Sequence, residues 1–283
     1  MTDSERDPQV SSAQDAPPFW LTAASYWMPT HFYETRAWVT HAPFAFWLMD
    51  ALRPRSIVEL GTHYGFSCFV FAEAARRLSL DCSITALDSW VGEEHAGVYG
   101  EDVFESVVST VARDYPDTVR LLRGWFEESR PQIADGSVDL LHIDGRHGYE
   151  DALADYTSWR STVREGGIIL FHDIAEHRQG FGVWRLWDQL SAEHRTFAFE
   201  HGHGLGVLAV GEVRAAPLAA LFDADEATAT RIRAEYERLG AAVARQADLE
   251  ALPAELEAIL ASRSWRLTRP LRDVAWKVRA RRR

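Results

Sequence analysis

The stretch SIVELGTHYGFSCFVFAEAARRL, residues 56–78, decides the fold. An apolar run ends at Gly61, a second glycine follows at Gly65, and an amphipathic pattern with helical spacing then begins. A buried strand that turns through glycines into a helix is typical of the ligand-binding edge of a parallel α/β sheet. The rest of the chain repeats this unit of strand and helix.

Apolar, strand-like runs alternate with helix-period segments from residue 56 to residue 213. The strand candidates are SIVELG, SITALDSW, VRLLRG, VDLLHIDG and GIILFHDI, followed by TFAFEH and GVLAVG. This alternation predicts a Rossmann-like, doubly wound α/β fold with a mostly parallel seven-stranded sheet and helices on both faces. The short HGHGL connection between the last two runs predicts a hairpin, which places an antiparallel strand near one edge.

Composition divides the chain into five parts. Residues 1–18 are polar and predict a disordered N-terminus, residues 19–55 are rich in aromatic residues and predict a helical cap, and residues 56–213 form the sheet domain. Residues 214–263 predict a helical extension that packs on the domain or pairs with another subunit. Residues 264–283 form a basic amphipathic tail, which is either a solvated end or an attachment to an anionic membrane surface.

The overall composition indicates a globular protein of the cytoplasm. Apolar residues make up 47% of the 283 residues, and the net charge of −12 argues against nucleic acid as a partner. The N-terminus has no apolar signal region, and no apolar run is long enough to span a bilayer. Cys68 and Cys82 have neither a metal-binding nor a disulfide spacing, which suits a reducing compartment. If the basic tail attaches to a membrane, the expected contact is peripheral and at its inner face.

The spacing of the glycines narrows the choice of ligand. A dinucleotide site needs G-x-G-x-x-G to seat a pyrophosphate, whereas here Thr62 follows Gly61 and the next glycine is Gly65. The expected ligand therefore lacks a phosphate. Glu59 precedes the turn, and Asp88 ends the next strand, where a carboxylate can accept both hydroxyls of a ribose. A nucleoside with an amino-acid tail, such as S-adenosylmethionine, fits this pattern.

Five segments, in this order, resemble the motifs of the class I S-adenosylmethionine-dependent methyltransferases. They are VELGTHYG, ALDSW, LLRGWFEES, DLLHIDGRHGYE and GGIILFHDI, and the resemblance covers roughly residues 44–213. Within this family the chain is similar to the branch of bacterial sugar and small-molecule O-methyltransferases (methyltransferase domain family 24). The resemblance implies an enzyme that binds S-adenosylmethionine and methylates a hydroxyl group.

The resemblance also assigns cofactor contacts to residues of these motifs. Gly61 and Gly65 would approach the methionine part of the cofactor with Glu59 and Thr62 beside them, and Asp88 would hold the ribose. The other implied contacts are Ser89 and Trp90 beside the nucleoside, Trp125 and Phe126 against the adenine, and Asp144 below the sulfonium.

Two mechanisms are open for removing the proton of the acceptor hydroxyl. The loops after the fourth and fifth strands supply Asp144, His147, His172 and Asp173. In the first mechanism, Asp144 and Asp173, together with His172, hold Mg²⁺ or another divalent metal. His172 stands where related enzymes have an acid, which weakens the case for a hard cation. In the second, His147 or His172 is a general base suited to neutral pH.

The expected substrate is a small molecule or a glycan. Glu94 and His95, which follow Asp88 in the segment GEEHAGVYGE, are expected to contact it together with Tyr149. The leading hypothesis is methylation of a sugar hydroxyl in bacterial polysaccharide biosynthesis, with natural-product tailoring as an alternative. A non-catalytic cofactor-binding scaffold in a glycan-assembly complex is a further alternative. An NAD-dependent oxidoreductase is disfavoured by the missing third glycine. The helical extension predicts a homo-oligomer.

Overall fold

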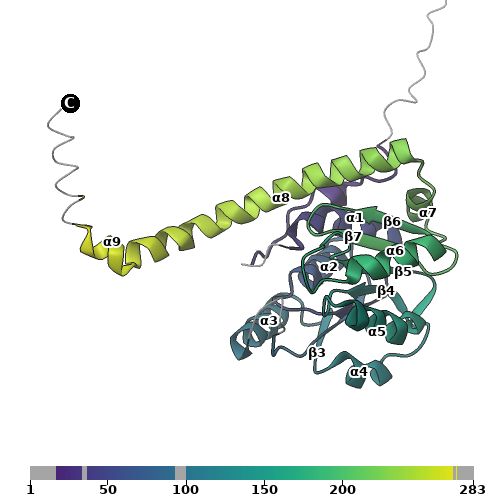
Figure 1. Ribbon diagram of the computed structural model, residues 1–283, viewed down its shortest axis with the longest axis horizontal. Coiled ribbons are helices and arrows are strands. Elements are labelled where there is room, and N and C mark those ends of the chain that lie inside the picture. Colours follow the sequence, from purple (N-terminus) through teal and green to yellow (C-terminus); the bar gives the residue numbers. More distant parts are fainter. Residues whose placement is uncertain (1–16, 34–36, 93–99, 270–271, 273–283) are drawn as a thin grey trace, which may run out of the picture.

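The computed structural model describes residues 17–33, 37–92, 100–269 and 272 (Figure 1). The predicted disordered N-terminus, apart from its last two residues, lies outside the described residues, and so does most of the predicted basic tail. The predicted substrate residues Glu94 and His95 also lie outside them.

A seven-stranded sheet forms the middle layer, in the order β3-β2-β1-β4-β5-β7-β6. The strands are β1 (Ser56–Leu60), β2 (Ser83–Asp88), β3 (Val119–Arg123), β4 (Val138–Ile143), β5 (Val163–His172), β6 (Thr196–Phe199) and β7 (Leu205–Ala209). Strand β7 pairs antiparallel with β5 and β6, whereas the other neighbouring strands are parallel. The predicted doubly wound sheet with an antiparallel strand near one edge is confirmed.

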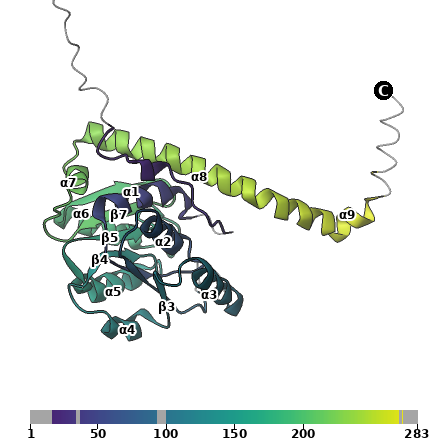
Figure 2. The same ribbon diagram turned by 180° about the vertical axis from the view of Figure 1, so that it is seen from behind.

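Helices cover both faces of the sheet (Figures 1 and 2). They are α1 (Ala42–Leu52), α2 (Phe66–Arg77), α3 (Glu101–Asp114), α4 (Phe126–Ser129), α5 (Tyr149–Trp159), α6 (Val183–Glu193), α7 (Ala216–Phe222), α8 (Glu226–Ala261) and α9 (Arg263–Leu267). Short 3-10 turns lie at Ala23–Tyr26, Val39–His41, Arg130–Gln132 and Arg160–Thr162.

Side chains alternate between two cores because successive strand residues point to opposite faces. On β1, Ile57 packs with the core that contains α1 and α2, whereas Val58 and Leu60 pack with the core that contains α5 and α6. Strand β4 follows the same rule, with Leu140 in the first core and Leu141 in the second. Both faces of the central strands are thus buried, as expected of a parallel sheet.

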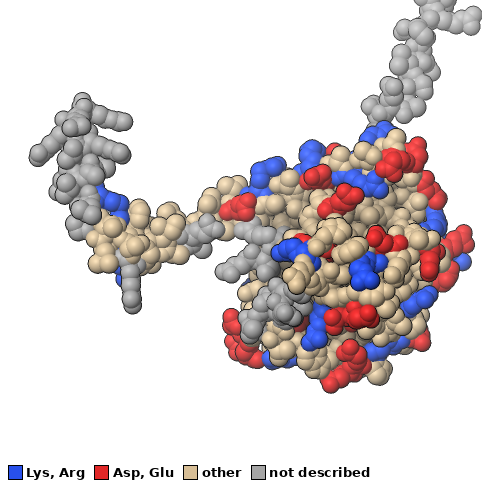
Figure 3. Space-filling view, viewed as in Figure 1, with Lys and Arg blue, Asp and Glu red and all other residues tan. Residues whose placement is uncertain are grey.

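The first half of α8 packs on the domain, and its second half extends away from it (Figures 1 and 2). In the packed half, the Tyr236 hydroxyl is buried and lies 3.3 Å from Ser25 Oγ. Gly240 lets the helix approach Thr40, because a Cβ there would lie 2.3 Å from the Thr40 carbonyl oxygen. Figure 3 shows mainly uncharged side chains on the protruding half. Among the described residues, no helix is both long and apolar enough to cross a membrane.

The turns at the carboxyl ends of the strands are held side by side by backbone hydrogen bonds. The N–H of Gly61 donates to the Leu87 carbonyl at 2.9 Å, and the N–H of Asp144 donates to the Leu60 carbonyl at 2.8 Å. Gly124 N–H donates to the Asp88 carbonyl at 2.9 Å. These bonds continue the ladder past the strand ends and fix four loops around one space.

Candidate functional site

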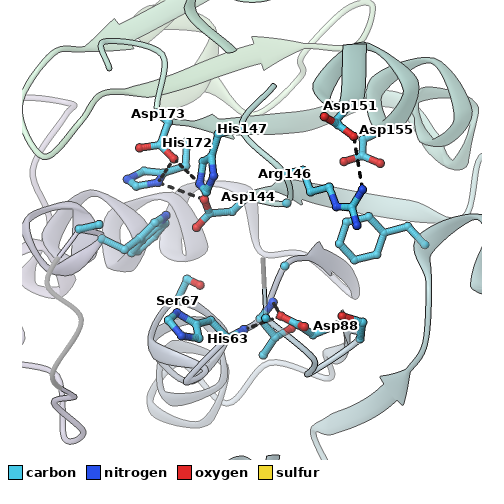
Figure 4. A pocket seen from close by; sticks show the side chains of 18 of the residues that line it. His63, Ser67, Asp88, Asp144, Arg146, His147, Asp151, Asp155, His172 and Asp173 are labelled. Carbon is cyan, nitrogen blue, oxygen red and sulfur yellow. Dashed lines mark hydrogen bonds and ion pairs between the residues drawn. The ribbon is translucent and has the colours of Figure 1, made fainter. Parts of the chain in front are cut away.

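A cavity of about 570 Å³ lies at the carboxyl ends of the parallel strands, where open α/β sheets bind their ligands (Figure 4). Most of the residues predicted for the site line it. They are Gly61, Thr62, Asp88, Ser89, Trp125, Phe126, Asp144, His147, His172 and Asp173. The described residues predicted for the site that do not line it are Glu59, Gly65, Trp90 and Tyr149.

The two glycines serve the packing of the protein itself. Gly61 has φ +90°, and a Cβ there would lie 1.9 Å from the carbonyl oxygen of Asp144. Gly65 has φ +84°, and a Cβ there would lie 2.7 Å from the ring of Phe69. The expected approach to a methionine moiety is therefore available at Gly61, which lines the cavity, whereas Gly65 is the N-cap of α2 and does not line it.

The carboxylate of Asp88 shapes the turn after β1. Its Oδ2 accepts the backbone N–H groups of Thr62, at 3.0 Å, and His63, at 2.8 Å, while Oδ1 accepts the N–H of Trp90 at 2.7 Å. Trp90 is buried and donates its Nε1–H to the His63 carbonyl at 2.9 Å, so it supports the turn instead of facing the cavity. Asp88 thus joins the first two motifs at the cavity wall.

A buried polar network lies beneath the cavity and includes Glu59. Trp38 Nε1–H donates to His142 Nε2 at 3.1 Å, so the neutral imidazole carries its proton on Nδ1 and donates it to Glu59 Oε1 at 3.0 Å. Ser67 Oγ donates to the same Glu59 oxygen at 2.6 Å. Glu59 is fully buried and does not line the cavity. Its hydrogen bond positions the side chain of Ser67, which does line the cavity.

Carboxylates and imidazoles gather after β4 and β5. Ligand atoms of Asp144, His147 and Asp173 all lie within 4.8 Å of one another. His147 Nε2 lies 2.9 Å from Asp173 Oδ2 (Figure 4). His172 Nδ1 lies 3.1 Å from Asp144 Oδ1 and 3.4 Å from Asp173 Oδ2, and His172 Nε2 lies 3.1 Å from the carbonyl oxygen of Gly202.

The electrostatics of this group change the expected role of His172. Burial lowers the pKa of His172, but Asp144 and Asp173 outweigh burial and raise that pKa well above its ordinary value. Burial raises the pKa of each carboxyl, yet the adjacent imidazolium keeps the pKa of both Asp144 and Asp173 below the usual range. Both nitrogens of His172 then donate, so in this protonated form the ring has no lone pair with which to act as a base.

The same group fits a divalent cation. Two carboxylates and one imidazole nitrogen converge from two loops, and the carbonyl of Gly202 holds a histidine directly behind them. A mixed oxygen and nitrogen set suits Mn²⁺, Fe²⁺ or Zn²⁺ better than Mg²⁺, which prefers oxygen ligands. The structure brings His147 into this set, whereas sequence reasoning placed His172 there.

The opposite end of the cavity is formed by aromatic and charged side chains. Trp125 is 45% exposed, and the Arg146 guanidinium lies 5.3 Å from the centre of its ring. Arg146 Nη1 lies 3.8 Å from Asp151 Oδ1, on the side of the cavity away from His172 (Figure 4). The ring of Phe126 lies against Gly145, where a Cβ would come within 2.7 Å of it.

Tyr149, which was predicted to contact the substrate, does not line the cavity. It is the first residue of α5, and its hydroxyl donates to Gln189 Oε1 on α6 at 3.0 Å. Its ring is therefore turned towards α6, away from the cavity.

Sequence reasoning also missed several residues that line the cavity. They include Trp38, His63, Ser67, Asp155 and Phe181. Asp155 and Ser67 lie inside helical patterns, and Trp38 lies far from every motif, so no local signal marks them.

The chain is similar to known proteins. A family model described as a methyltransferase domain matches residues 58–174. The chain is 46% identical over 192 residues to the uncharacterized protein y4gI of Sinorhizobium fredii, a match that covers 68% of this chain and 21% of that protein. It is 30% identical over 130 residues to the O-methyltransferase hkm8 of Aspergillus hancockii, covering 45% of this chain and 47% of that protein. The chain thus spans about a fifth of the length of y4gI and about half of the length of hkm8.

The comparison with solved structures matches the chain to two O-methyltransferases. The enzyme from Bacillus cereus, in complex with SAH, is 20% identical, with a TM-score of 0.49 over 65% of this chain and 84% of that chain. TomG from Streptomyces achromogenes, involved in tomaymycin synthesis and bound to SAM, is 18% identical, with a TM-score of 0.47 over 68% and 97% of the two chains.

Proposed function

We propose that this chain, whose residues 58–174 form a class I S-adenosylmethionine-dependent methyltransferase domain, transfers a methyl group to a hydroxyl of a small molecule or glycan. One observation carries the proposal. A single cavity joins the turn braced by Asp88 to the cluster of Asp144, His147 and Asp173. A donor and an acceptor bound in it would lie next to each other, which is what a displacement reaction requires.

S-adenosylmethionine, when bound, supplies a methyl group on a sulfonium, which is a good leaving group. Asp88 and Ser89 are the proposed partners of the ribose hydroxyls, because they end β2 at the cavity wall. Thr62 and Ser67 offer polar groups to the amino-acid tail beside β1. Trp125 and Phe126 offer flat apolar surfaces to the adenine.

Proton removal is the second task of the site. The acceptor oxygen bonds to the methyl carbon as the sulfur–carbon bond breaks, and its proton must pass to a base. His147 is the proposed base, because it lines the cavity and Asp173 orients its ring and stabilises the imidazolium that forms. His172 is the positioning residue behind it, held by the carbonyl of Gly202.

A cation offers the competing route. Asp144, His147 and Asp173 would hold it, and His172 would orient the two carboxylates. A bound divalent cation would lower the pKa of an acceptor hydroxyl and so replace the base.

Methyl transfer from S-adenosylmethionine to a panel of sugars and phenols, after treatment with a chelator, tests the proposal. Turnover that survives chelation and falls about a hundredfold or more in His147→Ala would favour the base. Turnover lost on chelation and restored by Mn²⁺ would favour the cation. His194→Ala is the control, because His194 lies at the end of α6 outside the cavity. Absence of transfer to every acceptor would contradict the proposed activity.

A sugar hydroxyl of a bacterial glycan is the proposed acceptor. Support comes from the rings of Trp38, Tyr64 and Phe181, which line the cavity and suit stacking on a sugar face. Natural-product tailoring is the second candidate, and the match to the O-methyltransferase hkm8 supports O-methylation in either case. A non-catalytic scaffold would need the cofactor contacts but not the cluster of Asp144, His147 and Asp173. We also propose that the protein is bacterial and cytoplasmic, that it contacts an anionic membrane, and that it forms a homo-oligomer.

A further inference from the structure

Asp155 is a buried carboxyl group that faces the cavity and has no hydrogen-bond partner among the described residues. It lies on α5, its residue is 7% exposed, and it is one of the lining residues. A Cβ built on Gly145 would lie 3.0 Å from Asp155 Oδ2 and 2.7 Å from the ring of Phe126. The carboxyl and the aromatic ring therefore share the space beside Gly145, at the end of the cavity where Arg146 lies (Figure 4).

The surroundings of Asp155 favour its neutral form. Burial raises its pKa, and the charges of Glu127 on α4 and Asp151 on α5 raise it further, while Arg146 in the loop after β4 lowers it. The result is a pKa of about 7. A neutral carboxyl group offers one O–H donor and one carbonyl acceptor side by side, whereas a carboxylate only accepts.

We propose that Asp155 recognises the adenine of the cofactor, donating its O–H to a ring nitrogen and accepting a hydrogen bond from the neighbouring 6-amino group. This inference rests on the proposed function, which places the adenine against Phe126. Adenine presents an amino donor beside a ring-nitrogen acceptor on either edge of the 6-amino group, so it complements a neutral carboxyl group at two points. Phe126 supplies the flat wall, and Asp155 supplies hydrogen bonds that depend on the identity of the base.

The two substitutions Asp155→Asn and Asp155→Leu separate recognition from packing. Asparagine keeps a donor and an acceptor in the same places but does not titrate. Leucine has a similar volume and offers neither. Calorimetric titration of S-adenosylhomocysteine into the wild type and both variants, at about pH 6 and about pH 8, gives the dissociation constants.

Wild-type affinity should fall about tenfold between about pH 6 and about pH 8, because Asp155 ionises and loses its donor. The Asp155→Asn variant should bind with nearly the same affinity at both pH values. Any change that it does show measures the effect of other titrating groups, and this change is subtracted from that of the wild type. Asp155→Leu should bind about tenfold more weakly at both values. Equal affinities of wild type and Asp155→Leu, or an Asp155→Asn variant as weak as the leucine variant, would overturn the inference.

Analogues of the base supply a readout that a structural role would not change. The 1-deaza and 7-deaza forms of S-adenosylhomocysteine each lack one ring nitrogen beside the amino group. One of them should bind the wild type about tenfold more weakly than the parent does, and Asp155→Leu should not distinguish it. Failure of both analogues to show this difference would contradict the inference. Failure of the wild type to bind S-adenosylhomocysteine at all would contradict the proposed function itself.

Discussion

A single glycine determines how closely the first and fourth motifs approach each other. Gly61 has φ +90° and leaves no room for a Cβ, which would lie 1.9 Å from the Asp144 carbonyl oxygen. Gly61→Ala should therefore reduce the free energy of unfolding by about 3 kcal/mol or more, because the backbone of Asp144 cannot move aside as a flexible side chain can. Urea denaturation measures the loss.

Gly136 is the matched control for Gly61. It also has a positive φ, +65°, but nothing lies within 4 Å of a Cβ built there. Gly136→Ala should cost only about 1 kcal/mol, from the strained backbone alone. Losses of equal size at the two positions would show that the backbone conformation, and not the contact with Asp144, makes glycine necessary.

Helix α8 contains two halves with different surroundings. In the first half, Tyr236 is 1% exposed and packs on Phe44, so this part belongs to the domain core. In the second half, four exposed apolar residues recur at heptad spacing. They are Leu249, Leu252, Leu256 and Ile259, with exposed fractions of 60%, 53%, 55% and 52%. Such a seam on a protruding helix is typical of pairing between helices.

A second copy of the chain is the partner expected for this seam. Residues 246–261 contain four acids and no Lys or Arg, whereas residues 262–272 contain four arginines and no acid. Seams that face each other in register bring these acids together in either orientation, whereas an antiparallel pair that is offset towards the C-terminal ends places acids of one copy near arginines of the other. The protruding half of α8 is therefore expected to self-associate.

Substituting Leu252→Asp together with Leu256→Asp should convert the protein to a monomer, because two charges would be buried in the seam. Light scattering on a sizing column measures the mass. The unfolding transition at low protein concentration should stay unchanged, whereas Tyr236→Ala should lower the free energy of unfolding by about 3 kcal/mol. An unchanged mass in the double variant would contradict self-association through α8.

At the scale of the whole molecule, the sequence alone predicted the elements that follow local rules. The seven strands and the antiparallel strand near the edge could be predicted from the alternation of strand and helix patterns. Asp88, Asp144 and Asp173 could be placed at the cavity because each lies at the carboxyl end of a strand or directly after it. The buried network through Glu59 and His142 could not be predicted, because its hydrogen bonds join Glu59, His142 and Trp38, which are far apart in the chain.

The structure differs from the sequence-based prediction at two further residues, Tyr149 and His172, and both differences arise from contacts between distant parts of the chain. Tyr149 lies within the fourth motif, but the first turn of α5 directs its hydroxyl to Gln189 on α6. Both histidines of the cluster were candidate bases, and only the three-dimensional arrangement shows that both nitrogens of His172 face acceptors, one of them the Gly202 carbonyl. A side chain's direction and its partners depend on tertiary packing, which motif spacing does not contain.

Binding of S-adenosylmethionine to the chelator-treated protein is the most direct test of the central claim. Calorimetric titration should give micromolar affinity for the wild type and for the control Asp81→Ala, whose side chain is 98% exposed. Asp88→Ala should lose at least about tenfold in affinity, because it removes the proposed ribose contact and the brace of the turn at Thr62 and His63. A wild type that does not bind, or an Asp88→Ala variant that binds equally well, would contradict the account.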